Sequence, residues 1–358
     1  MPPVFRKCKG VMAAWGIGGE TMVLPDHAGI PFGGMENKYF MIEVHYDNPA
    51  LHRDVVDSSG LRLFYTKKLR KNDAVTLMAG ANVGKTVIIP PGQQKYVVAG
   101  HCGHRCLEKV VPEDGLKIFA VFPHSHLIGK EILVRHFRNG SELAPIVVDR
   151  NYDFNYQEYR YLPEEVTILP EDHLTVECVY DSTSRQTTTF GGFSTKDEMC
   201  LAFFFYYPKT NMSFCLSSPM SNLIAGLAGY SGVFESPPSA QNEGFHKYIR
   251  DYKWPKSFMP VIQGALRYGP HEQMCENEGT YNEYKTESTT YPEAKPYKTI
   301  SPCRSPDMKA HAISHQNLDP SAPKKSTNSN GVKRLKESHV YIFTTSVISV
   351  FIVQKLVF

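Results

Sequence analysis

Residues Lys38–Tyr46 read KYFMIEVHY, and apolar residues alternate with polar or smaller ones along this stretch. Successive residues of a β-strand point to opposite faces of its sheet, so such alternation gives the strand one apolar face. That face would carry Phe40, Ile42, Val44 and Tyr46, and the opposite face would carry Met41, Glu43 and His45. The stretch therefore predicts a β-strand that covers a core on one side.

The same organisation extends over residues 1–275, where Gly, Pro, Asn or Asp interrupts short apolar runs every eight to twelve residues. This spacing is typical of β-sandwiches and barrels. No apolar period of 3.6 residues persists over four helical turns, which argues against long amphipathic helices. We therefore expect an all-β fold, with further strands at Leu61–Thr66, Lys95–Ala99, Leu116–Phe122, Ile132–Phe137, Leu174–Tyr180 and Met199–Tyr207.

Length and charge limit the classes of function. A chain of 358 residues is long enough for two domains, each with its own core. The 39 Lys and Arg residues against 36 Asp and Glu residues give a net charge of +3, which is too balanced to predict a nucleic-acid partner.

The cysteines and two glycosylation sequons favour an oxidising compartment. Eight cysteines are scattered through the chain, which suits a disulfide framework. The sequons are Asn139-Gly140-Ser141 and Asn211-Met212-Ser213. The first residues, MPPVFRKC, carry no apolar signal-peptide core, so we expect the chain to start inside a domain of a secretory-pathway protein.

The C-terminal part changes in composition. Residues 276–339 are rich in Ser, Thr, Pro, Lys and Asn, and predict a disordered stalk. Residues 340–358 are almost wholly apolar and could span a bilayer as a tail anchor. They could equally be a lipid-anchor signal, with the small residues of 326–331 as a cleavage region, or a buried C-terminal strand.

One histidine pair stands out among the 14 histidines. His124 and His126 follow the strand-like run LKIFAV, and a two-residue spacing on a strand puts both imidazoles on one face. Neutral imidazole suits copper, zinc, nickel and iron, so the pair alone does not choose the metal. A thioether ligand would favour Cu(I). Met199, at the start of an apolar strand, is a candidate for it, although Met199 as core filler is the simpler interpretation.

A zinc knuckle is the competing metal site. His101-Cys102-Gly103-His104-Arg105-Cys106 places two cysteines beside histidines. A structural zinc site needs a second ligand pair at short spacing, and none follows.

Several spaced motifs resemble a known family. HSHLIGK, followed 73 residues after its second histidine by GGFSTKDEMC, is similar to the methionine-bearing copper site of the ascorbate-dependent type II copper monooxygenases. Ser125 stands where the family pattern has threonine. PDHAGIPFGG, EVHYDNP and DSSGLRLFYTKKLR resemble the dopamine β-hydroxylase branch more closely than the peptide-amidating branch. The similarity covers about residues 8–275.

This resemblance implies a set of metal ligands. His124, His126 and Met199 would hold the copper that activates oxygen, with His124 in the catalytic centre. His45 matches one of three histidines that hold the second, electron-donating copper, and is otherwise a half-buried strand histidine. The other two histidines have no counterpart here, so we expect one copper in this chain, against two in a complete enzyme.

The resemblance also implies disulfides and domains. Cys102 would pair with Cys215, Cys106 with Cys275 and Cys178 with Cys200, whereas Cys8 would pair upstream and Cys303 has no counterpart. We expect two β-sandwich copper domains, the first incomplete, followed by an ordered extension, the stalk and the apolar tail. Their ranges are 1–71, 72–225, 226–275, 276–339 and 340–358.

The function implied is hydroxylation of a small substrate, such as the phenethylamine dopamine of catecholamine metabolism, with copper, ascorbate and molecular oxygen. Membrane tethering would come from the tail, and exposed strand edges in the first domain would favour a homo-oligomer. With one ligand of the second copper site, we expect this chain alone to hydroxylate poorly. The alternative is a non-catalytic copper-binding or interaction protein that keeps the fold after losing half of a site.

Overall fold

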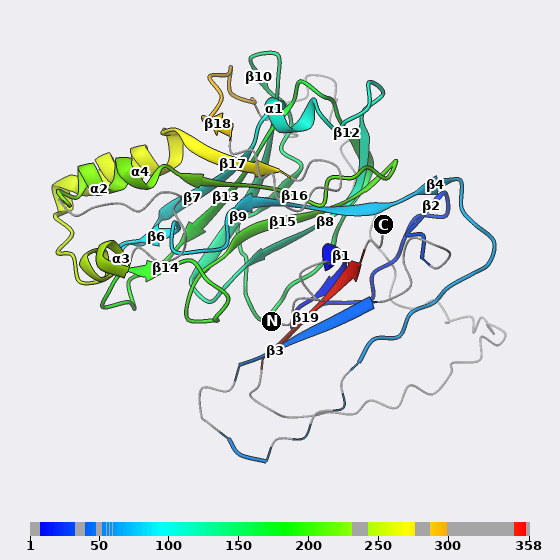
Figure 1. The fold of residues 1–358 in the computed structure, drawn as a ribbon, viewed down its shortest axis with the longest axis horizontal. Coiled ribbons are helices and arrows are strands. Elements are labelled where there is room, and N and C mark those ends of the chain that lie inside the picture. The colour runs from blue at the N-terminus through cyan, green and yellow to red at the C-terminus, as the bar shows by residue number, and fades with distance from the viewer. Residues whose placement is uncertain are drawn as a thin grey trace, which may run out of the picture. The chain divides into compact units, whose positions relative to one another are not determined.

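The computed structural model describes residues 8–32, 40–47, 52–54, 56, 58, 60–230, 243–275, 287–298 and 347–355. Strands dominate these residues, which confirms the all-β prediction (Figure 1). A five-stranded sheet contains β7 (Tyr96–Cys102), β9 (Gly129–Arg138), β10 (Ser141–Glu142), β11 (Val147–Asp149) and β13 (His173–Tyr180). A seven-stranded sheet contains β5 (Val75–Ala81), β8 (Leu116–Ser125), β12 (Arg160–Ile168), β15 (Cys200–Tyr207), β16 (Phe214–Pro219), β17 (His271–Cys275) and β18 (Glu287–Thr289).

The two large sheets enclose one hydrophobic core. The five-stranded sheet contributes Val98, Val134 and Val176, and the seven-stranded sheet contributes Val121 and Phe204, all buried. Each such side chain contributes about 1.5–3 kcal/mol when it leaves water, so this core is the main stabilising feature of the fold.

Strand β15 separates this core from a second apolar cluster. Its even-numbered residues face the space between the sheets, whereas Leu201, Phe203 and Phe205 belong to the second cluster on the other face. The neighbouring strand β8 changes face part-way, because Phe205 pairs with Ala120 and Tyr206 pairs with Ile118, which leaves Phe119 as a bulge. The bulge shifts the alternation by one residue, so the C-terminal half of β8 turns its even-numbered residues towards the second cluster.

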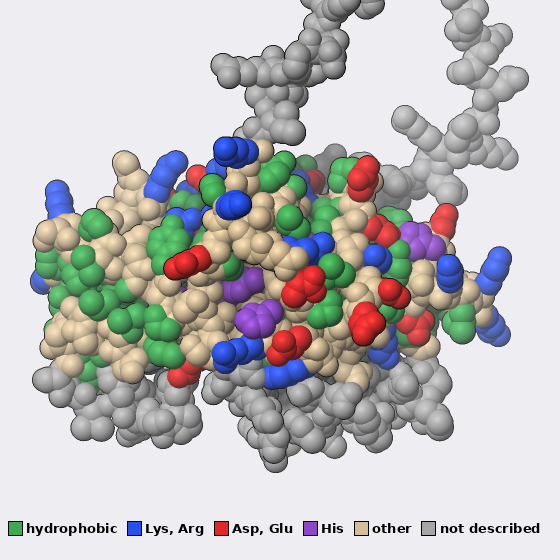
Figure 2. Space-filling model, turned by 90° about the horizontal axis from the view of Figure 1, so that it is seen from above, with side chains coloured by type: hydrophobic (Ala, Val, Ile, Leu, Met, Phe, Trp, Pro, Cys, Tyr) green, Lys and Arg blue, Asp and Glu red, His purple; other side chains and the backbone are tan. Residues whose placement is uncertain are grey.

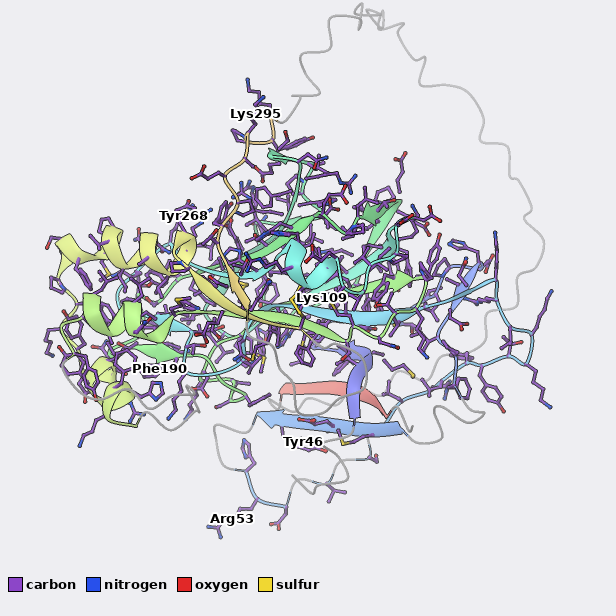
Figure 3. All side chains as sticks on the ribbon, turned by 45° about the horizontal axis from the view of Figure 1, so that its top comes forward. Tyr46, Arg53, Lys109, Phe190, Tyr268 and Lys295 are labelled. Carbon is purple, nitrogen blue, oxygen red and sulfur yellow. A yellow bond between two sulfur atoms is a disulfide. The ribbon has the colours of Figure 1, made fainter. Side chains whose placement is uncertain are left out.

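A third, three-stranded sheet has the order β1 (Cys8–Trp15), β19 (Val347–Lys355) and β3 (Phe40–Asp47). Figure 3 labels Tyr46 on β3. Strand β19 comes from the apolar tail, so for residues 347–355 the structure has the C-terminal strand that the sequence left as an alternative to a membrane or lipid anchor. No helix among the described residues is long and apolar enough to cross a membrane.

The remaining elements are short. Two helices and a 3₁₀ turn lie within the predicted extension, and a third helix begins before it. All three helices contribute to the core between the sheets, with Ile224, Ile249 and Leu266. The short strands are β2 (Ala28–Gly29), β4 (Asn72–Asp73), β6 (Ile88–Ile89) and β14 (Thr189–Phe190). The helices are α1 (His104–Leu107), α2 (Ser221–Leu227), α3 (Glu243–Arg250) and α4 (Met259–Tyr268), with the 3₁₀ turn at Lys256–Phe258.

Two expectations differ from the structure. The stretch Leu61–Thr66 is not a strand, and the side chains of Phe64 and Tyr65 are 83% and 73% exposed. Its alternation of apolar residues predicted a strand that the structure does not have. Among the described residues, no neighbouring strand pairs with this stretch. Residues 287–298 of the predicted stalk form β18 and an extended segment that follows it. Together they are here called the strap, which pairs with β17 at one end and with Ser141 near the other. The rest of the predicted stalk lies outside the described residues.

Candidate copper site

The predicted histidine pair lies at the end of β8. The register pairs Ser125 with Cys200 and His124 with Leu201, which puts His124 on the face of the second apolar cluster. His126 directly follows β8, two residues after His124, and the centroids of the two imidazole rings are 5.3 Å apart. Both side chains are buried, with 2% and 5% exposed. The structure therefore brings the two candidate ligands together, as the spacing predicted.

Hydrogen bonds orient both rings in the same way. The Nδ1 of His124 lies 2.8 Å from the Oε1 of Gln157, whose own amide nitrogen donates to the carbonyl of Phe154. The Nδ1 of His126 lies 3.0 Å from the carbonyl oxygen of Asp197. Both acceptors require the proton on Nδ1, so Nε2 carries the lone pair in each neutral ring. A metal binds imidazole through such a lone pair, and a donated Nδ1–H is the usual support for a ligating histidine.

Met199 lies on the same face of the sheet. It directly precedes β15, and continuing the β8–β15 register by one residue sets it across from His126. Its side chain is 4% exposed and packs in the cluster that contains Phe122 and Phe203. Tyr180 fixes its backbone, because the phenol donates to the Met199 carbonyl at 2.6 Å. Core packing and a position beside the histidines thus coincide at Met199.

Glu198 holds the turn that carries the histidines. Its carboxylate accepts hydrogen bonds from the backbone N–H of His126 at 2.9 Å and of Ile128 at 2.8 Å, and from the Ser125 hydroxyl at 3.1 Å. Ser125 replaces threonine in the family pattern and still supplies the donor. Burial raises the pKa of Glu198 to about 7, while these donors favour the charged form. One carboxylate thereby accepts two backbone N–H groups and one hydroxyl of the turn.

Gln157 links the site to the first part of the chain. The backbone N–H of Gln157 donates to the carbonyl of Ile17 at 2.8 Å, just after β1. Gly16 packs so closely that a Cβ on it would lie 2.8 Å from the Cδ of Gln157. Tyr159 adds a second link, because its hydroxyl lies 3.2 Å from the Ala14 N–H that donates to it. The orientation of His124 therefore depends on residues from both predicted domains.

The candidate for the second site, His45, lies in β3, and its backbone pairs with Ser349 of β19. Its side chain lies outside the described part of the structure. Within the described residues, no group of three or more His, Cys, Asp or Glu side chains is arranged to hold a metal. Two histidines and a methionine are therefore the donor set that the structure offers.

Three disulfide bonds support the site and its surroundings. They are Cys102–Cys215, Cys106–Cys275 and Cys178–Cys200, the pairs that the family resemblance implies. Cys178–Cys200 joins the two sheets directly beside Met199. Because Cys102 and Cys106 are both in disulfides, neither is a zinc thiolate, which excludes the zinc knuckle. Cys303 and the side chain of Cys8 lie outside the described residues.

Sequence reasoning missed Gln157 and Glu198. Glu198 stands inside the quoted motif KDEMC, so its position beside Met199 was a signal that could have drawn attention to it. Gln157 is 33 residues from His124 in a loop, and no local pattern marks it.

Comparison with known families agrees with this geometry. The C-terminal domain of the copper type II ascorbate-dependent monooxygenases matches residues 72–225, and the N-terminal domain of the same family matches residues 1–53. The chain belongs to this family.

The chain is similar to DBH-like monooxygenase protein 1 of Mus musculus, with 40% identity over 270 residues that cover 72% of this chain and 44% of the relative. MOXD1 homolog 1 of Drosophila melanogaster is 46% identical over 217 residues, 60% of this chain and 31% of the relative. Human dopamine beta-hydroxylase is 35% identical over 218 residues, 61% of this chain and 35% of the relative. The chain thus spans less than half the length of these curated relatives.

Proposed function

We propose that this chain contains the oxygen-activating half of a copper- and ascorbate-dependent monooxygenase of the dopamine β-hydroxylase type. In this proposal His124, His126 and Met199 bind one copper, and His45 contributes to a second copper. The observation that carries the proposal is the pair of buried imidazoles with matched tautomers, each with its Nδ1–H donated to a fixed oxygen.

The donor set suits copper better than other metals. Two imidazoles and one thioether favour Cu(I), whereas zinc prefers thiolate, imidazole and carboxylate in a closed tetrahedron. The Glu198 carboxylate, which lies at the turn, is engaged by three donors.

The protein residues would have separate tasks. Copper, when bound, would supply the one-electron chemistry by which dioxygen hydroxylates a C–H bond, with ascorbate as the source of electrons. Gln157 and the Asp197 carbonyl keep each imidazole in the tautomer that presents Nε2. Phe122 stacks near the His124 ring, with centroids 6.5 Å apart, and helps to keep that side of the site dry. Glu198 fixes the spacing of the two histidines through their shared turn.

We propose a phenethylamine as substrate, since relatives are named for dopamine and tyramine. Passage through the secretory pathway is supported by the three disulfides, because such bonds persist in oxidising compartments. Membrane attachment through the C-terminal residues and homo-oligomer formation stay predictions.

The test is ascorbate-dependent hydroxylation of tyramine or dopamine by the full chain, measured as product formed per oxygen consumed. Because this chain holds one predicted ligand of the second copper site, the wild type should form product slowly. His124→Ala should abolish that product, because the site loses one of two imidazoles. His104→Ala is the matched control, since His104 is exposed and lies outside the site. Equal product from wild type and His124→Ala would contradict the proposal. Copper uptake without product in the wild type would instead support the non-catalytic copper-binding alternative.

A further inference from the structure

The sequon at Asn139 lies at the tip of a tight hairpin. Strands β9 and β10 pair Arg138 with Ser141, so Asn139 and Gly140 form a two-residue loop. Both residues have positive φ, 48° and 68°, as a type I′ turn requires. Asn139 is exposed, so the folded protein can accommodate a group attached to its side chain.

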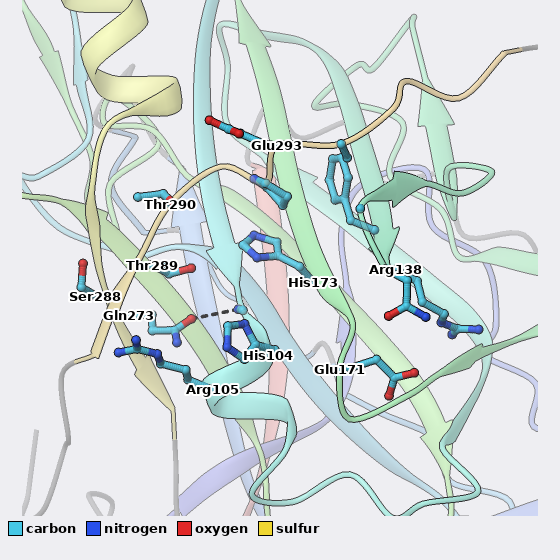
Figure 4. A pocket seen from close by; sticks show the side chains of 16 residues that line it. His104, Arg105, Arg138, Glu171, His173, Gln273, Ser288, Thr289, Thr290 and Glu293 are labelled. Atoms are coloured by element: carbon cyan, nitrogen blue, oxygen red, sulfur yellow. Dashed lines mark hydrogen bonds between the residues drawn. The ribbon is translucent and has the colours of Figure 1, made fainter.

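A cavity of about 350 Å³ opens beside this hairpin. Its wall includes Asn139 and Gly140 of the hairpin. Figure 4 labels Thr289, Thr290, His173 and Gln273, which also line it. The volume falls in the range of small-ligand sites, about 300–1,000 Å³. On the face seen in Figure 2, histidine side chains reach the surface among acidic and basic ones.

The strap closes the cavity by bonding to the sequon hairpin itself. The N–H of Lys295 donates to the carbonyl of Gly140 at 3.0 Å, and the N–H of Glu142 donates to the carbonyl of Lys295 at 2.9 Å. At its other end β18 pairs with β17. Figure 3 shows Lys295 on the strap, beyond the end of β18. The strap thus runs from the sheet to the turn that carries Asn139.

A buried polar group points to a ligand in the cavity. Gln273 is fully buried, and its Oε1 accepts the N–H of Gly103 at 2.9 Å, the dashed line of Figure 4. Its Nε2 is buried and has no hydrogen-bond partner among the residues that the structure describes. A buried donor left in this state costs about 1–3 kcal/mol, so an acceptor from a ligand would stabilise it.

The rest of the wall combines charged side chains, those of Arg105, Arg138, Glu171 and Glu293, with neutral groups. Burial lowers the pKa of His173 to about 3, so its imidazole is uncharged. Its Nε2 lies 3.4 Å from the Nδ1 of His101, and its Nδ1 lies on the Gly103 side of the cavity. Thr289 and Thr290 add hydroxyl groups, and Phe137 adds an aromatic ring. Donors, acceptors and an aromatic ring in one small cavity suit a sugar with an acetamido group.

We propose that Asn139 carries an N-linked glycan and that its first N-acetylglucosamine occupies this cavity, where it holds the strap to the hairpin. The acetamido carbonyl would accept from Gln273 Nε2, and sugar hydroxyls would bond to His173 and the strap threonines. The inference rests on the proposed secretory routing but is independent of copper binding.

The modification itself is ordinary glycosyl transfer. The Nδ2 of Asn139 bonds to C1 of the sugar, the C1–oxygen bond to a lipid pyrophosphate donor breaks, and the amide proton passes to a base of the transferase. The transfer takes place on the unfolded chain, before Ser141 pairs with Lys295 of the strap.

The first experiment uses the full chain behind a heterologous signal sequence in mammalian secretory cells. Mass spectrometry of tryptic glycopeptides should find Asn139 occupied. Peptide-N-glycosidase F, applied to native protein, should leave the Asn139 glycan in place and remove any glycan at Asn211, the exposed sequon that serves as control. After denaturation it should remove both. An unmodified Asn139 would overturn the proposal. So would removal of the Asn139 glycan from the folded protein without any change in the amide hydrogen exchange of the strap.

The second experiment measures hydrogen exchange of residues 288–297. Ser141→Ala and Asn139→Asp both prevent glycosylation, and aspartate still tolerates positive φ. In both variants the strap amides should exchange at least tenfold faster, whereas Asn211→Gln should exchange like the wild type. Trimming the glycan to one N-acetylglucosamine should preserve the slow exchange. Unchanged exchange in Ser141→Ala, or loss of protection on trimming, would contradict a role for the first sugar.

Discussion

Replacing Gly16 by alanine should weaken copper binding at a site that Gly16 does not touch. The new Cβ would lie 2.8 Å from Cδ and 2.9 Å from Nε2 of Gln157, distances that real Cβ atoms do not adopt. Gly16 is buried and follows β1 directly, so the backbone has little freedom to retreat. The Gln157 amide must therefore move, and its hydrogen bond to His124 Nδ1 lengthens or breaks.

The expected size of this effect follows from what Gln157 does. Loss of one buried hydrogen bond lowers the free energy of unfolding by about 1 kcal/mol. Loss of the partner that orients a ligating histidine typically lowers metal affinity by about 10–100-fold. Competition with a chromophoric Cu(I) chelator should therefore show a Cu(I) Kd raised by one to two orders of magnitude. Gly84→Ala is the control, because a Cβ there would meet nothing within 4 Å.

A double-mutant cycle identifies the route of the effect. If Gly16→Ala acts through the amide, then adding it to Gln157→Ala should change the Cu(I) Kd little further. Wild-type affinity in Gly16→Ala, or additive losses in the double variant, would refute the link from Gly16 through Gln157 to His124.

Two further predictions concern stability. Burial lowers the pKa of His271 from 6.5 to about 4, so between these values the unfolded chain binds the proton and the free energy of unfolding falls as the pH falls. His271 should therefore lower the free energy of unfolding by about 2 kcal/mol at pH 5 relative to pH 8. In urea unfolding, the free energy of His271→Gln should fall correspondingly less between pH 8 and pH 5. A fall equal to that of the wild type would exclude His271 as the cause. Removing Cys178–Cys200 with Cys178→Ala/Cys200→Ala should lower the unfolding free energy by about 3 kcal/mol, and equal urea midpoints for variant and wild type would contradict this.

The sequence predicted the architecture well where alternation was supported by neighbouring strands. Strands near six of the seven expected ranges are present. The five of them that belong to the two large sheets have apolar residues that face a core. Leu61–Thr66 has the same composition without neighbours, and pairing between distant segments is not visible in a local pattern. Strand β8 shows a second limit, because the bulge at Phe119 reverses which residues face the core.

The candidate site was only partly accessible from the sequence. His124 lies at the end of β8 and His126 directly follows it, so their two-residue spacing was enough to predict that they lie together. The position of Met199 beside them came from the family resemblance, since the β8–β15 register joins residues 73 apart. Gln157 comes from a loop whose place depends on packing against Gly16 and Ile17, which no local signal encodes.

The central claim is that His124, His126 and Met199 bind one copper, and X-ray absorption of the Cu(I)-loaded chain tests it most directly. The wild type should bind one equivalent with nitrogen and sulfur scatterers. Met199→Ile should lose the sulfur signal and weaken Cu(I) more than Cu(II), because only Cu(I) favours thioether sulfur. Met274→Ile, on β17, should behave like the wild type. A sulfur signal that survives Met199→Ile, or equal weakening of both oxidation states, would contradict the assignment.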